Sequence, residues 1–158
     1  IGNYRPEASA NESNKVFIEG KPIKFEIVLE GRISLVKPGQ NDSVLGMTTL
    51  MKIDMAVSKL LANSDRGLDM GMHCRDVIDL AMLNLTKAEF AEATTKGEAP
   101  YGEAILKDLA KVIGMLGEAN GLLERCMKAM DVSVPRALLW QNISKVKSYI
   151  ANGIPNAS

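Results

Sequence analysis

The sequence predicts a mainly α-helical protein: a bundle-like domain of four to five helices with a small antiparallel β element at its N-terminal side. Three observations support this fold class. Apolar residues recur at helical spacing over much of residues 44–151, and strict alternation is confined to residues 23–30. The chain also has nine methionines but only three Phe, three Tyr and one Trp. We therefore expect an aliphatic helical core rather than a β-sandwich.

The β element is predicted over residues 15–36. Between residues 23 and 30 apolar side chains alternate with mostly polar ones, as in a half-buried strand. A shorter strand is predicted at 16–18, separated by Gly20-Lys21-Pro22, and Gly31 either turns the chain into a third strand at 33–36 or forms a bulge in one long strand. The element is therefore a hairpin or a three-stranded meander. Because so few strands are marginally stable alone, we expect it to pack on helices or to pair with another chain.

Five helices are predicted after residue 43 from hydrophobic periodicity and from their terminal residues. They cover residues 44–62, 68–85, 87–95, 102–130 and 135–151. Thr86 and Glu89 have the spacing of a capping box at the start of the third helix. One alternative stays open for the fourth: Asn120-Gly121 ends it early and leaves two shorter helices.

The domain limits follow from composition. Residues 1–14 and 152–158 are polar and aperiodic, which predicts a flexible N-terminal arm and a C-terminal tail. Residues 15–151 show no internal repeat, no low-complexity tract and no shift in composition. We therefore expect one α-rich globular domain over 15–151, with the β element at 15–36 and the helices within 44–151.

The charge balance and the cysteine content limit which partners and which cellular compartment are expected. Lys plus Arg and Asp plus Glu are both 19, a balance unusual for a protein dedicated to neutralising phosphate. No apolar run approaches the ~20 residues of a membrane span, so no membrane partner is expected. The two cysteines, Cys74 and Cys126, form no C-x-x-C pair. This favours the cytoplasm or another reducing intracellular compartment over a disulfide framework.

Three glycines point to a close-packing groove on the helix predicted at 102–130. Gly114, Gly117 and Gly121 fall on one sector of that helix, away from its apolar stripe. A glycine inside a helix costs about 1 kcal/mol relative to alanine. Close approach of another backbone can offset that cost. The occupant is either a neighbouring helix of the same chain or a helix from a second copy or another protein.

Three methionines suggest a second interaction surface. Met47, Met51 and Met55 have spacing i, i+4, i+8 on the helix predicted at 44–62 and form a stripe beside its aliphatic one. Either this helix is central in the bundle, or a partner covers the methionine side, since methionine makes adaptable contact surfaces. With the three glycines, these are the predicted partner-binding residues.

Basic residues allow a nucleic-acid surface as an alternative. Residues 121–158 hold five bases against two acids, and several lysines lie in the β region. Such a surface would combine the β element with the last helix. Its residues would be Lys21, Lys24, Arg32, Arg136, Lys145 and Lys147. Glutamates interleave with the lysines of the β region and would repel phosphate.

A metal site is the second alternative. Asp69, His73 and Asp76 share one face of the helix predicted at 68–85, and an imidazole with two carboxylates can begin a metal site. His73 is the only histidine, however, and the same pattern suits an imidazole that simply has acidic neighbours. Phosphate-binding glycine loops, hydrolase motifs and zinc-ligand spacings are absent from the sequence. We therefore assign no catalytic residue and expect no cofactor, and we expect both cysteines to be small buried apolar residues.

Taken together, these features favour a non-enzymatic protein–protein interaction or self-assembly subunit, either a homo-oligomer or a partner of another protein. A viral or phage structural or accessory protein fits this profile, as does a first residue that is Ile1 rather than Met. The alternatives are a nucleic-acid-binding protein and a small metal-dependent enzyme at Asp69, His73 and Asp76.

Overall fold

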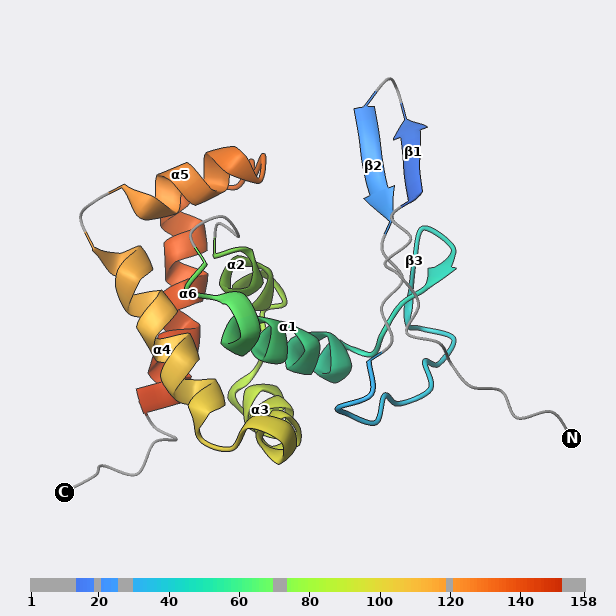
Figure 1. Cartoon of the computed structure of the whole chain (residues 1–158), viewed down its shortest axis with the longest axis horizontal. Coiled ribbons are helices and arrows are strands. Elements are labelled where there is room, and N and C mark those ends of the chain that lie inside the picture. Colours follow the sequence, from blue (N-terminus) through green and yellow to red (C-terminus); the bar gives the residue numbers. More distant parts are fainter. Residues whose placement is uncertain (1–13, 19–20, 26–29, 70–73, 119–120, 152–158) are drawn as a thin grey trace, which may run out of the picture. The chain divides into compact units, whose positions relative to one another are not determined.

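The structure is a computed structural model of the 158-residue chain. It describes residues 14–18, 21–25, 30–69, 74–118 and 121–151 (Figure 1). The chain divides into two compact units, Ile1–Arg32 and Ile33–Ser158, which are described separately. The predicted arm over 1–14 and tail over 152–158 fall almost entirely outside the described residues, and the predicted domain limits stay a prediction.

The first unit contains an antiparallel hairpin of β1 (Asn14–Ile18) and β2 (Lys21–Phe25). Val16 pairs with Ile23 and Phe17 with Pro22, so the small N-terminal hairpin expected from the sequence is confirmed. Pro22 belongs to β2 rather than to a break before it. A two-stranded ribbon tolerates this proline because both of its strands are edges, where a missing amide donor is acceptable. The second half of the predicted strand, residues 26–29, lies outside the described residues.

The second unit is helical, which confirms the mainly α fold class. Its described residues form α1 (Lys52–Arg66), α2 (Arg75–Met82), α3 (Lys87–Tyr101), α4 (Ala104–Gly117), α5 (Leu122–Ala129) and α6 (Arg136–Ala151). α1 packs against α2, α3 and α4, and α6 packs against α2 and α4 (Figure 1). The largest fully buried side chains are all Leu, Ile or Val, as expected for an aliphatic helical core.

The predicted helix at 44–62 begins only at Lys52, so its first turns were predicted wrongly. Residues 43–48 instead form a second hairpin of β3 (Ser43–Val44) and β4 (Met47–Thr48). Leu45 and Gly46 make its two-residue turn, with φ of 51° and 78°. Positive φ at both turn residues matches the twist of antiparallel strands. The third strand expected at 33–36 is also wrong, because these residues form an irregular segment in which the Val36 amide donates to Asp54 Oδ2 at 2.6 Å.

Other helix ends also differ from the expectation. α3 continues past the predicted end at 95 to Tyr101, with Pro100 inside its last turn. α2 begins at Arg75, whereas the prediction began at residue 68. The helix predicted over 102–130 is two helices: α4 ends at Gly117 with Glu118 in extended conformation, and α5 begins directly after Gly121, which adopts φ of 69°. This confirms the alternative of two shorter helices, although α4 ends before Asn120-Gly121, and it brings the described helices to six.

Two helix predictions are confirmed closely. Thr86 and Glu89 form the expected capping box: the Glu89 amide donates to the Thr86 hydroxyl, and the Thr86 amide donates to the Glu89 carboxylate. α6 begins one residue after the predicted start and ends at the predicted residue. None of the helices in the described ranges has both the length and the apolar character needed to cross a membrane.

Candidate protein interaction site

The β3–β4 hairpin presents an apolar tip to solvent, formed by Val44, Leu45 and Met47. Leu45 is 94% exposed, Met47 66% and Val44 58%. The base of the hairpin is fixed by backbone hydrogen bonds from the Thr49 amide to the Asp42 carbonyl (2.9 Å) and from Asp42 N to Gly39 O (3.2 Å). The apolar tip is therefore held away from the core by an ordered scaffold.

Leu45 is an unusual residue for its position. A left-handed φ costs a residue with a Cβ roughly 1–2 kcal/mol, so turns of this type usually carry Asn, Asp or Gly. At 94% exposure Leu45 also contributes nothing to the core of the chain. Neither the turn nor the described part of the core explains a leucine here, which makes the residue a candidate for a binding contact.

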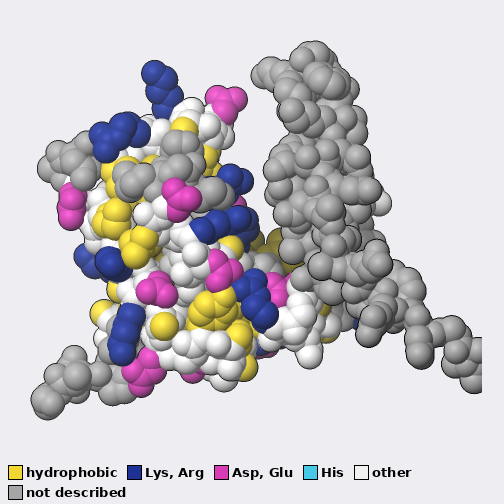
Figure 2. Space-filling view, in the orientation of Figure 1, with side chains coloured by type: hydrophobic (Ala, Val, Ile, Leu, Met, Phe, Trp, Pro, Cys, Tyr) yellow, Lys and Arg dark blue, Asp and Glu magenta, His cyan; other side chains and the backbone are white. Residues whose placement is uncertain are grey.

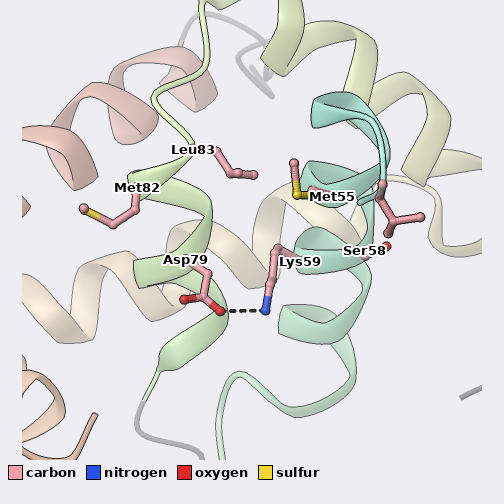
Figure 3. A pocket seen from close by; sticks show the side chains of 7 residues that line it. Met55, Ser58, Lys59, Asp79, Met82 and Leu83 are labelled. Atoms are coloured by element: carbon pink, nitrogen blue, oxygen red, sulfur yellow. Dashed lines mark hydrogen bonds and ion pairs between the residues drawn. The ribbon is translucent and has the colours of Figure 1, made fainter. Parts of the chain in front are cut away.

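An apolar hollow of about 370 Å³ lies between α1 and α2 (Figure 3). α1 contributes Met55, Ser58 and Lys59, and α2 contributes Asp79 and Met82. The lining is completed by Leu83, which follows α2, and Leu50, which precedes α1. Met55 and Met82 flank the hollow from opposite sides, so two flexible side chains can adjust to what enters it (Figure 3).

The charged groups beside the apolar hollow are paired with one another. Lys59 Nζ lies 2.6 Å from Asp79 Oδ2 and 3.5 Å from Asp76 Oδ1. Asp76 is buried and also accepts from Arg66 Nε at 3.0 Å. Two cations thus neutralise two carboxylates, so nothing in the lining calls for a charged ligand.

The predicted methionine stripe is wrong as a helical feature, because its first two members precede α1. Met47 lies in β4 and Met51 is the residue before the first turn of α1. Met47 instead belongs to the apolar tip and Met55 to the apolar hollow. Sequence reasoning missed Leu45 and Met82. Gly46 was the only local turn signal beside Leu45, and the apparent helical periodicity obscured it.

The three predicted glycines do not share one groove, which corrects the single helical face expected for them. A Cβ on Gly117 would lie 2.9 Å from Cη2 of Trp140, so α6 of the same chain fills that position. A Cβ on Gly114 would meet nothing within 4 Å. Gly121 lies beyond the end of α4, at the left-handed residue before α5.

The predicted basic surface is divided between the two units. Lys21 and Lys24 lie in β2, opposite Ile18 and Lys15. Arg32 Nη2 lies 2.7 Å from Glu30 Oε2 at the end of the first unit. Hydrogen bonding from Arg32 holds the pKa of the Glu30 carboxyl below its usual range, so this arginine faces its own acidic neighbour.

Two of the three basic residues predicted on α6 form polar contacts within the chain. Arg136 pairs with Glu124, and Lys145 Nζ donates to Asn84 Oδ1 at 2.8 Å. Lys147 is exposed. On the face of the helical unit visible in Figure 2, Lys and Arg side chains are interspersed with Asp and Glu side chains. That face shows no continuous positive surface for a phosphate backbone.

The predicted metal triad is not arranged on one helix. α2 begins at Arg75, so Asp69 precedes the helix that carries Asp76, and His73 lies outside the described residues. The Asp76 carboxylate is occupied by Arg66 and Lys59. Within the described ranges, no group of three or more His, Cys, Asp or Glu is placed to hold a metal ion.

The two cysteines meet in the core. Cys74 directly precedes α2, Cys126 lies in α5, and the two thiols lie close enough for Cys126 to help raise the pKa of Cys74. Burial raises the pKa of both thiols, that of Cys74 to about 12. Both are buried apolar residues, as predicted, but their sequence spacing gave no signal that they touch.

Comparison of the chain with protein-family models, with curated proteins and with solved structures gives no match.

Proposed function

We propose that this protein is a non-enzymatic subunit that self-associates through the apolar tip of its β3–β4 hairpin. The observation that carries the proposal is Leu45, an almost fully exposed leucine in a left-handed turn conformation. A single exposed leucine is ordinary on a protein surface. Here it stands between exposed Val44 and Met47, on a scaffold that directs all three to solvent.

The apolar area needed for association extends beyond the tip. Leu35 and Val36, in the segment that leads to the hairpin, are 43% and 51% exposed. A stable dimer typically buries ~800 Å² on each partner. Burial of the Leu45 side chain alone contributes about 1.5–3 kcal/mol, which corresponds to roughly a tenfold to hundredfold change in the dissociation constant.

The test compares two Leu→Asp substitutions by sedimentation over a dilution series. Leu45→Asp places a charge in the apolar tip and should weaken self-association at least ~10-fold. Leu138→Asp is the matched control, because Leu138 is also an exposed leucine, at 46%, but lies in the first turn of α6. An aspartate there suits the helix dipole, so this variant should associate like the unmodified protein.

Equal dissociation constants for Leu45→Asp and the unmodified protein would refute the role given to the tip. Far-ultraviolet circular dichroism of both variants should match the unmodified protein, since neither leucine is part of the buried core.

A further inference from the structure

We infer that the apolar tip of one copy occupies the apolar hollow between α1 and α2 of a second copy, and that two copies exchange tips reciprocally in a closed dimer. This inference rests on the proposed function and names the partner and its receiving site. Among the residues that the structure describes, none fills the hollow and none covers the tip.

The two surfaces match in chemistry. The tip carries no charge, and the hollow is lined mainly by Leu50, Met55, Met82 and Leu83. Lys59 and Asp79 are already paired with each other, so an uncharged apolar occupant leaves no new charge unpaired. A hollow of about 370 Å³ lies at the lower end of the ~300–1,000 Å³ typical of binding pockets, which suits a few side chains better than a large ligand.

The geometry of the hairpin favours a second copy over the same chain. The paired strands and the Thr49–Asp42 hydrogen bond hold the tip in a conformation that leaves Leu45 94% exposed. Docking the tip into its own hollow would require the hairpin to swing about the short connection between β4 and α1. Insertion into another copy requires no such rearrangement.

The position of Leu50 favours a closed dimer over an open-ended, head-to-tail oligomer. Leu50 lines the hollow and follows Leu45 by only five residues, so the hairpin is anchored beside the hollow. The tip is therefore tethered to the edge of the hollow by a short stretch of chain. Two copies related by a two-fold axis can then make the tip-to-hollow contact twice in one interface.

The test uses variants that each add one cysteine to the otherwise unchanged chain. Leu45→Cys and Ser58→Cys proteins are mixed and treated with a short bis-maleimide. The expected product has twice the chain mass of 17.1 kDa and joins one copy of each variant. Cys74 and Cys126 are buried, with thiol pKa values raised by that burial, and should not react. Leu138→Cys mixed with Ser58→Cys is the control pair.

Charge variants give a second readout. Leu45→Asp blocks the tip and Met82→Asp blocks the hollow, so each alone should dimerise at least tenfold more weakly than the unmodified protein. In an equal mixture, the intact tip of the Met82→Asp copy meets the intact hollow of the Leu45→Asp copy. Mixed dimers should therefore be more stable than dimers of either variant alone.

The failures of the two proposals are distinguishable. A protein that stays monomeric at high concentration contradicts both. If the protein is a dimer but the Leu45→Cys and Ser58→Cys pair cross-links no better than the control pair, the tip-to-hollow contact is wrong. The proposal of self-association would still hold. Cross-linking within one chain of the Leu45→Cys/Ser58→Cys double variant, without any increase in mass, also overturns the inference.

Discussion

At the scale of single residues, Asp54 joins three parts of the helical unit. This carboxylate is fully buried in α1. One oxygen accepts the Val36 amide at 2.6 Å and the other binds the ammonium group of Lys96 in α3. It therefore fixes the segment that carries the β3–β4 hairpin to the helices beneath. A buried charge is stable only while such partners are present.

Asp54→Ala should lower the free energy of unfolding by about 3–5 kcal/mol, because it leaves the Lys96 ammonium without its buried partner. Glu103→Ala is the control, since the Glu103–Lys107 pair is exposed and should matter by less than about 0.5 kcal/mol. Urea unfolding of both variants measures the difference. If both variants lowered the free energy of unfolding by a similarly small amount, the Asp54 carboxylate would not anchor the segment that carries the β3–β4 hairpin.

The buried cysteines predict a loss of stability at alkaline pH. In the unfolded chain a thiol titrates near pH 9.0, whereas burial holds Cys74 protonated to about pH 12. Between these values the folded state binds more protons than the unfolded state, so the free energy of unfolding falls as the pH rises. Urea unfolding from pH 8 to about pH 10.5 tests this. A Cys74→Ala/Cys126→Ala variant should show a shallower decline, and an identical slope would contradict the account.

At the scale of elements, Gly114 and Gly117 provide a matched pair on α4. Gly114→Ala should raise the free energy of unfolding by about 1 kcal/mol, because its Cβ enters open space in a helix interior. Gly117→Ala should not raise the free energy of unfolding, because the added Cβ would lie 2.9 Å from the Trp140 ring. Trp140 is the only tryptophan, so its fluorescence emission should change in Gly117→Ala alone. Equal stabilisation by both substitutions would mean that α6 does not close on Gly117.

The elements predicted best from the sequence are those with explicit end signals. The Thr86 and Glu89 pair located the start of α3, and hydrophobic periodicity with Pro135 located α6 to within one residue. Prediction failed where a helical spacing arose by chance. The methionines at 47, 51 and 55 imitate a helical stripe, although the chain forms a hairpin before α1. Local patterns cannot exclude such coincidences, because tertiary contacts decide between them.

At the scale of the whole molecule, contacts distant in sequence were beyond prediction. The thiol contact between Cys74 and Cys126, and the Trp140 ring over Gly117, depend on how the helices pack rather than on any local signal. The candidate site was predicted only in part. Met47 and Met55 were named for the wrong geometric reason, and Leu45 was missed because its turn was assigned to a helix. A hollow between two helices has no sequence signature at all.

The central claim is that the protein self-associates through uncharged apolar surfaces. The most direct test is its mass by light scattering after size-exclusion chromatography, at low and at high salt, with absorbance recorded at 260 and 280 nm. We predict twice the chain mass of 17.1 kDa at both salt concentrations, with the absorbance of pure protein, because salt does not screen an apolar contact. A monomer at both salt concentrations, or a peak whose 260 nm absorbance is lost at high salt, would contradict the claim. The second result would instead support nucleic-acid binding.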